Sequence, residues 1–232
     1  MLGPLNYIIW LVAFLAEGYV VVCAFAQKDF LPYFSLNFYM FAVALASVGE
    51  YYYLQRFGFA SVQYYYFYYY SDFLLTVFLF FAVTGLYEHV FREMKLSQYI
   101  RVGAGLLLVA TAAFSYLVVL QHKGHLTGRF VVELGQNLYF VGVVLTYLLW
   151  GAVLKLRETR ARLVQLVLAL GIYFSASAAT YALRNLFTGL EFLKIIPPVV
   201  NTWLPLAWAY TFTKVPEDAR LATARLAARL SR

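Results

Sequence analysis

The sequence predicts an all-α integral membrane protein with seven transmembrane helices, its amino terminus outside and its carboxyl terminus in the cytoplasm. Three observations carry this prediction: an apolar composition, seven apolar stretches of membrane-spanning length, and an uneven distribution of Lys and Arg between alternate linkers. Of the 232 residues, 63% are hydrophobic and 12% are charged, against roughly 25% charged in an ordinary soluble domain. This composition excludes a water-soluble globule. Cys23 is the single cysteine, so an intrachain disulfide framework is excluded as well.

Each predicted span is an apolar stretch of about 20 residues, the helical length that crosses a hydrocarbon core about 30 Å thick. Short charged or turn-forming linkers separate the stretches, so neighbouring helices are expected to be antiparallel and packed together. The predicted spans are residues 5–26, 34–54, 61–87, 102–121, 130–154, 163–187 and 192–212.

The orientation follows from the Lys and Arg residues on alternate sides of the membrane, because cytoplasmic loops carry the excess. One side holds thirteen of them: Lys28, Arg92, Lys95, Arg101, Lys155, Arg157, Arg160, Arg162, Lys214, Arg220, Arg225, Arg229 and Arg232. The other side holds five: Arg56, Lys123, Arg129, Arg184 and Lys194. The net charge of +7 is therefore explained by topology, and no nucleic-acid partner is expected.

The chain divides into a seven-helix transmembrane domain, residues 1–214, and a basic juxtamembrane segment, residues 215–232. Pro216, Glu217 and Asp218 suit the first turn of a helix. Leucines and arginines then alternate, which predicts a short amphipathic helix on the anionic inner leaflet. The alternative is that these basic residues only follow the positive-inside rule and bind no partner. Because the sequence stops at Arg232, a signal is expected to leave through another protein.

Tyrosine is concentrated in two places, residues 51–53 and residues 64–70, both expected near the outer surface. An aromatic belt explains part of this pattern, because tyrosine rings favour the membrane interface. Seven consecutive aromatic residues on a helix point in every direction, so some must face the bundle interior. Tyr65, Tyr68 or Tyr69, and Asp72 fall on one face at helical spacing, which predicts an aromatic ligand surface ending in a carboxyl group.

Polar residues within the spans are functional candidates, because they are costly in a membrane. Asp72 and Glu17 are expected near the midplane, Asn201 a little above it, and Glu50 about one turn from the outer surface. Glu133, Asn137 and Arg184 also lie in the outer half, with Arg184 as the expected partner of Asp72 or Glu133. The pattern predicts an outward-facing cavity that binds a ligand. The alternatives are headgroup snorkelling for Arg184, Glu133 and Glu50, and an interhelical hydrogen bond for Asp72.

Pro197 and Pro198 lie within the seventh predicted span, where the loss of two backbone donors predicts a kink and a hinge. Improved helix packing is the alternative. Their neighbour Asn201 shares this part of the span.

No catalytic chemistry is predicted. The sequence contains no hydrolase, zinc-protease or nucleotide-binding motif. His89, His122 and His125 all fall at helix ends or in loops, which excludes a haem held by two membrane histidines. We therefore expect a protein that is not an enzyme and that has no metal and no cofactor.

The seven-span topology is similar to that of the rhodopsins, but the depth of their retinal-binding lysine is occupied by Asn201, Thr202 and Trp203. Covalent retinal is thus excluded. The sequence predicts a receptor-like multi-pass protein of the plasma (inner) membrane that binds a small aromatic or amphipathic ligand. It would act as a sensor or accessory subunit through a cytoplasmic or membrane protein partner. The alternatives are a small-molecule or ion transporter or channel, which Glu17 would favour by facing the same cavity, and a structural subunit of a larger membrane complex.

Overall fold

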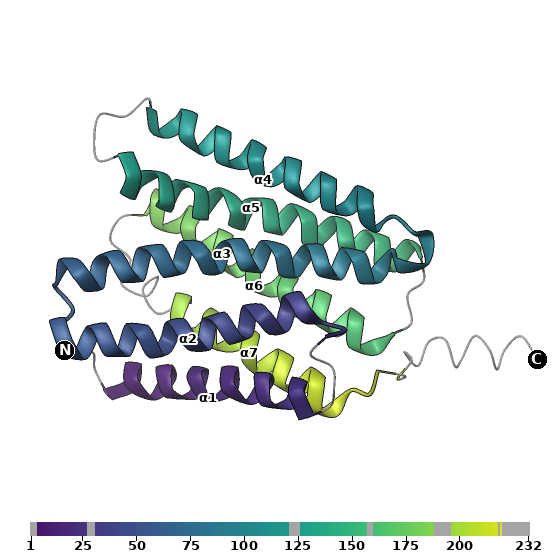
Figure 1. Cartoon of the computed structure of the whole chain (residues 1–232), viewed down its shortest axis with the longest axis horizontal. Coiled ribbons are helices and arrows are strands. Elements are labelled where there is room, and N and C mark those ends of the chain that lie inside the picture. The colour runs from purple at the N-terminus through teal and green to yellow at the C-terminus, as the bar shows by residue number, and fades with distance from the viewer. Residues whose placement is uncertain are drawn as a thin grey trace, which may run out of the picture.

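The structure is a computed structural model that describes residues 4–26, 31–120, 126–156, 160–187, 196–217 and 219. Over these residues the predicted all-α class is confirmed, with seven α-helices that lie side by side along one axis (Figure 1). The helices are α1 (Pro4–Ala26), α2 (Phe34–Phe57), α3 (Val62–Val90), α4 (Ser97–Leu120), α5 (Leu126–Lys155), α6 (Ala161–Leu186) and α7 (Ile196–Lys214). A short 3-10 helix, η1 (Arg92–Met94), lies between α3 and α4.

The turn between α2 and α3 shows how short linkers produce antiparallel neighbours. Gly58 ends α2 with a φ of +80°, a conformation in which glycine has no side-chain penalty. Ser61 then caps α3, because its Oγ accepts a hydrogen bond of 3.1 Å from the backbone N–H of Tyr64. The Ser61 hydroxyl also donates to the Gly58 carbonyl oxygen at 2.9 Å, which closes the turn.

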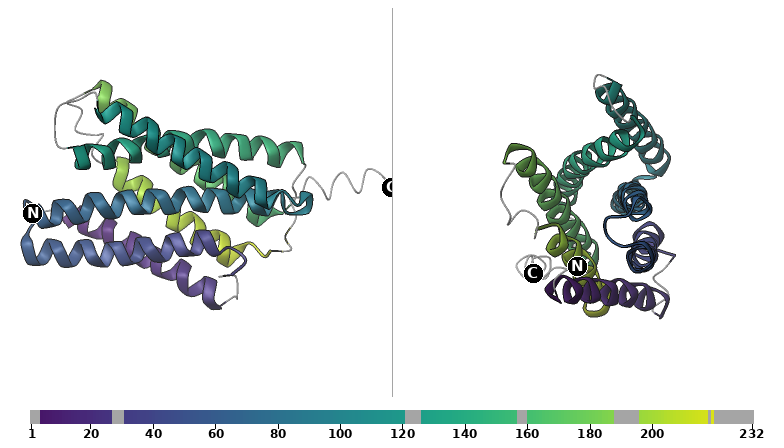
Figure 2. Two further views of the ribbon diagram at one scale, coloured as in Figure 1. Left: turned by 45° about the horizontal axis from the view of Figure 1, so that its top comes forward. Right: turned by 90° about the vertical axis from the view of Figure 1, so that its left-hand side faces the viewer.

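Six of the helices form a ring. Consecutive contacts run α1–α2–α3–α5–α6–α7 and return to α1, while α4 packs on the outside against α5 and α3. The right-hand view of Figure 2 looks along the helices and shows this arrangement, with α4 displaced from the ring. The outer position of α4 explains why only Thr111, Ser115 and Val119 of this helix are buried.

The two ends of the ring differ in how they are filled. The end with the α2–α3 turn is called the turn end, and the opposite end, where α3, α5 and α7 finish, is called the basic end. Large apolar side chains fill the ring toward the basic end, among them Leu86, Leu163, Trp208 and Phe212, each 1% exposed or less. The turn end contains instead the cavity described below.

Within the described residues, four helices are long and apolar enough to cross a membrane: residues 62–90, 97–120, 129–155 and 161–183. Within α1 the corresponding apolar stretch among the described residues is shorter, Trp10–Ala26. The helices α1, α2 and α7 nevertheless expose apolar side chains along their outer faces, including Leu15, Val22, Leu45 and Trp203.

The juxtamembrane segment predicted for residues 215–232 lies mostly outside the described residues. Its first part is held at the basic end by two contacts with α6. Arg162 is buried, and its Nε donates to the Val215 carbonyl oxygen at 2.9 Å. The backbone N–H of Ala161 donates to the Ala219 carbonyl oxygen, also at 2.9 Å.

Candidate functional site: a cavity inside the helix ring

A cavity of about 610 Å³ occupies the turn-end half of the ring. All six ring helices contribute lining residues, and α4 contributes none. The lining extends from Phe59 in the α2–α3 turn down to Leu79 and Leu204, where the buried core begins. In volume the cavity falls within the range of roughly 300–1,000 Å³ that small-molecule sites occupy.

Aromatic rings surround the cavity near the turn end. Trp10 of α1 stacks on Tyr51 of α2, with ring centroids 5.3 Å apart and an interplanar angle of 18°. On the other side, Phe59 contacts Tyr64 at 5.5 Å, and Tyr64 stacks on Tyr68 at 6.3 Å. These two groups come from α1, α2 and α3, so three helices and one turn build the aromatic rim.

Three carboxyl groups line the middle of the cavity, and each comes from a different helix: Glu17 from α1, Glu50 from α2 and Asp72 from α3. Glu17 is only 4% exposed, and its Oε2 accepts a hydrogen bond of 3.1 Å from the Ser47 hydroxyl. Among the described residues none of the three carboxyl groups forms an ion pair, since the one salt bridge there joins Arg101 to Glu88.

Tyrosine hydroxyls and an amide form the floor. Tyr173 of α6 donates from its hydroxyl to Asn201 Oδ1 of α7 at 3.2 Å, and the hydroxyls of Tyr139 and Tyr173 lie 3.5 Å apart. Tyr39 of α2 completes the group. All three tyrosines are buried, which in an apolar environment requires hydrogen-bond partners for their hydroxyls.

Helix α7 contributes its prolines. Pro197 and Pro198 line the cavity but lie in the first turn of the described helix rather than deep within a span. Proline is tolerated there, because the first N–H groups of a helix have no intrahelical acceptor. The proline inside α7 is Pro205, which also lines the cavity and cannot donate to the carbonyl of Asn201 four residues earlier.

The structure brings together several of the predicted site residues. Tyr68, Asp72, Asn201, Pro197 and Pro198 all line the cavity. Glu17 and Glu50, also predicted at membrane depth, line it too.

The two other predicted tyrosines do not belong to the lining. Tyr65 is 52% exposed, and its ring packs on Tyr69 with centroids 4.3 Å apart. Tyr64 takes the predicted place of Tyr65, because Tyr64, Tyr68 and Asp72 follow each other at four-residue spacing along the face that α3 presents to the ring.

Glu133 and Asn137 do not line this cavity. Asn137 of α5 donates from Nδ2 to the Ser115 Oγ of α4 at 2.9 Å, and Glu133 Oε1 lies 3.5 Å from the same nitrogen. This group joins α5 to α4 on the outside of the ring. The predicted partner for the cavity carboxyl groups, Arg184, belongs to α6, and its side chain lies outside the described residues.

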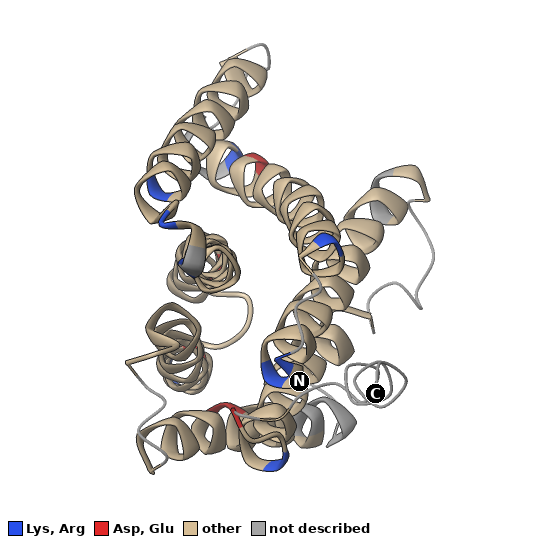
Figure 3. Cartoon of the chain, turned by 90° about the vertical axis from the view of Figure 1, so that its right-hand side faces the viewer, with Lys and Arg blue, Asp and Glu red and all other residues tan. Residues whose placement is uncertain are grey.

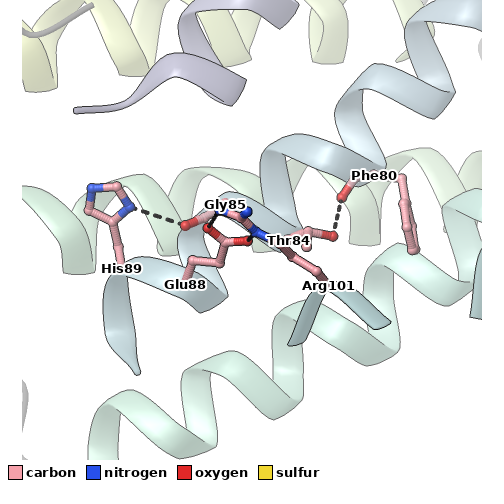
Figure 4. Close-up of polar contacts among 6 residues, drawn as sticks. All are labelled: Phe80, Thr84, Gly85, Glu88, His89 and Arg101. Atoms are coloured by element: carbon pink, nitrogen blue, oxygen red, sulfur yellow. Dashed lines mark hydrogen bonds and ion pairs between the residues drawn. The ribbon is translucent and has the colours of Figure 1, made fainter. Parts of the chain in front are cut away.

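The basic end carries polar contacts of another kind (Figure 4). Arg101 of α4 binds the Glu88 carboxylate of α3 through two contacts of 2.5 and 3.0 Å. His89 Nδ1 lies 3.1 Å from the Gly85 carbonyl oxygen, and its ring stacks on Tyr33 at 4.8 Å. Arg160, the residue before α6, donates to the His89 carbonyl oxygen at 3.1 Å. These contacts fasten helix ends together and are remote from the cavity lining.

Sequence reasoning missed Tyr39, Tyr139 and Tyr173 as site residues. Each is a single tyrosine among apolar neighbours, whereas the run at residues 64–70 is conspicuous. Their depth in the predicted spans could have identified them. A tyrosine far from the membrane interface must find a hydrogen-bond partner for its hydroxyl inside the protein.

Comparisons of the chain with protein-family models, curated proteins and solved structures find no match. The function must therefore be argued from the cavity itself.

Proposed function

We propose that this chain is a seven-helix protein of the plasma (inner) membrane that binds a small amphipathic ligand in the cavity of its helix ring. One observation carries the proposal: six helices close around 610 Å³ of space in which aromatic rings, three carboxyl groups and a tyrosine–asparagine floor converge. An apolar cavity with a few convergent polar groups is the usual form of a small-molecule site.

The proposal includes that all seven helices cross the membrane, although only four of the described helices are long and apolar enough by length and hydropathy alone. The polar side chains that lower the mean hydropathy of α2 and α7, among them Ser47, Glu50 and Asn201, line the cavity. The opposite faces of these helices carry exposed apolar side chains such as Leu45 and Leu206. A helix with one face toward an internal cavity and the other toward lipid requires this distribution.

The proposed orientation places the turn end outside. Seven described Lys and Arg residues belong to the basic end: Arg92, Lys95, Arg101, Lys155, Arg160, Arg162 and Lys214. Figure 3 views the bundle from that end, with these residue types in blue. Since basic residues are retained on the cytoplasmic side, the cavity opens toward the exterior.

Analysis of the purified protein for a retained ligand tests the proposal. The protein is solubilised in mild detergent, its visible spectrum is recorded, and bound small molecules and partner proteins are identified by mass spectrometry. We expect a small molecule that is lost from Asp72→Ala and retained by Glu133→Ala, a matched change to an acid outside the cavity. A ligand retained equally by both variants contradicts the cavity as its site. A cytoplasmic protein that co-purifies supports a sensor-like or accessory role.

Transport is the second candidate, and the position of Glu17 favours it. Glu17, Asp72 and Asn201 line one cavity. A pathway for an ion or substrate across the middle of the membrane requires such polar groups to share one space. Below them the ring is filled by buried side chains such as Leu79 and Val83, so a transporter would have to open the basic end in another state. Proteoliposomes with a pH-sensitive dye inside test this: a transporter or channel for protons gives a flux that Glu17→Gln abolishes, and a binding protein gives none.

A further inference from the structure

We infer that the ligand of this cavity is a small organic cation, a protonated amine or a quaternary ammonium. The inference rests on the proposed function, because it names the chemical class that the same cavity takes. Four features of the lining carry it: the sign of its charged groups, the direction of its hydrogen bonds, its aromatic faces and its size.

The charged groups that line the cavity are all acidic. Glu17, Glu50 and Asp72 converge from three helices, and the lining among the described residues contains no lysine, arginine or histidine. A carboxylate in such a cavity is costly without a counter-charge, and a cation between these groups would supply one. An anionic ligand would meet repulsion from the same groups.

Three hydroxyl groups of the lining donate to oxygen atoms of the protein. The hydroxyl of Ser47 donates to Glu17 at 3.1 Å. The hydroxyl of Thr76 donates to the carbonyl oxygen of Asp72, and that of Thr202 to the carbonyl oxygen of Pro198, both at 2.8 Å.

Helix α7 provides another acceptor, the backbone carbonyl oxygen of Asn201. This oxygen lacks the usual helical donor, because Pro205, four residues later, has no N–H. Tyrosine hydroxyls can donate or accept, so they do not indicate whether the ligand is a cation or an anion. The hydroxyl hydrogens of Ser47, Thr76 and Thr202 are thus already used, and the N–H donors of the lining side chains are the Asn201 amide and the Trp10 ring. The acceptors include three carboxyl groups, which suits a ligand that donates or carries positive charge.

The aromatic rim provides the complementary attraction. The faces of Trp and Tyr rings attract ammonium groups, and aromatic cages are a known solution for quaternary ammonium ligands. Here Trp10 and Tyr51 form a stacked pair at one side of the cavity, and Tyr64 and Tyr68 form another on α3. Acidic groups below aromatic faces favour an organic cation over a neutral aromatic compound.

The size of the site suits a small organic molecule better than a bare metal ion. Among the residues that the structure describes, no group of three or more His, Cys, Asp or Glu side chains lies close enough to hold one. The three carboxyl groups are instead distributed around a space of about 610 Å³, which matches a small organic molecule.

Three probes of the same shape and different charge test the inference. Benzyltrimethylammonium is the cation, neopentylbenzene is its neutral carbon isostere, and phenylmethanesulfonate is the anion. Each is titrated by calorimetry into the full chain in lipid nanodiscs, with empty nanodiscs subtracted. We expect the cation to bind at least tenfold more tightly than either of the others.

Variants then test whether the preference for the cation arises from the carboxyl groups of the cavity. Asp72→Asn and Glu17→Gln are expected to weaken cation binding at least tenfold and to leave binding of the neutral isostere within twofold. Glu133→Gln, an acid outside the cavity, is the matched control and should change neither. If size-exclusion chromatography shows that Asp72→Asn does not fold, Glu50→Gln takes its place.

Two results would overturn the inference. If the isostere or the anion binds as tightly as the cation, the cavity still binds ligands and the proposed function stands, but the charge class is wrong. If no probe gives saturable binding, the cation inference also fails, and the retained-ligand experiment decides the proposed function separately.

Discussion

Glu17 of α1 accepts a hydrogen bond from Ser47 of α2, with 3.1 Å between the Ser47 hydroxyl and the carboxyl oxygen, and both residues line the cavity. This contact joins α1 to α2 inside the ring, where α1 also packs against α7. Glu17 of the first helix therefore lines the same cavity as the acids of the second and third helices.

Removal of this contact should weaken the α1–α2 interface. For Ser47→Ala we expect a loss of about 1 kcal/mol of stability, the usual scale of an interhelical hydrogen bond in a membrane. Thermal unfolding in detergent measures it. Ser71→Ala is the control, since the Ser71 hydroxyl donates only to Tyr68 of its own helix at 3.0 Å. An equal decrease in both variants would contradict a special role for the Glu17–Ser47 contact.

Asn137 is predicted to stabilise the fold without affecting the ligand. Its bond to Ser115 joins α5 to α4, outside the ring. We expect Asn137→Ala to lower stability by about 1 kcal/mol and to leave cation binding unchanged in the calorimetric titration. Loss of binding at wild-type stability would return Asn137 to the ligand surface.

Gly142 of α5 packs against Phe174 of α6. A Cβ at this position would overlap the ring of Phe174, which is buried at 1% exposure. Gly142→Ala should therefore destabilise the protein by about 1–3 kcal/mol, the cost of overpacking a core. Gly151→Ala in the same helix is the matched control, because a Cβ there meets nothing within 4 Å. Similar melting temperatures for the two variants would refute this packing.

Protons should compete with the cation. The acidic groups that line the cavity are Glu17, Glu50 and Asp72, and its other titratable groups are tyrosines. Protonation removes the negative charge of a carboxyl group, so binding of a cation favours the ionised form. The affinity for benzyltrimethylammonium, whose own charge is independent of pH, is therefore expected to rise as pH increases. An affinity that is constant between pH 5 and pH 8 would contradict the electrostatic basis of binding.

The fold was accessible from the sequence because each span is a block of apolar residues between charged or turn-forming linkers. Each predicted span overlaps one helix, and the differences lie at the ends: α4 begins at Ser97 and not at residue 102, and α5 at Leu126 and not at residue 130. A hydropathy criterion leaves polar residues such as Ser97 and Gln98 out of the predicted span, although the helical backbone includes them.

The site was only partly accessible, because sequence gives depth along a helix but neither its rotation nor its neighbours. Asn137 and Tyr139 of α5 lie at similar depth, yet two residues along a helix turn a side chain by about 200°. Tyr139 faces the cavity and Asn137 faces α4. The one local signal for the outer position of α4 is that residues 102–120 contain no Asp, Glu, His, Lys or Arg, and the neighbours of α4 come only from the tertiary structure.

The accessibility of Asn201 from outside the cell directly tests whether the cavity opens outward. Cys23 is the single cysteine, so Cys23→Ser gives a cysteine-free background for Asn201→Cys and for Ser115→Cys at the α4–α5 contact. Intact cells are treated with a membrane-impermeant, cationic methanethiosulfonate reagent. A cavity that opens outward predicts modification of Asn201→Cys and protection of Ser115→Cys. Modification of Asn201→Cys only after the membrane is permeabilised, or not at all, would contradict an outward-facing cavity inside the helix ring.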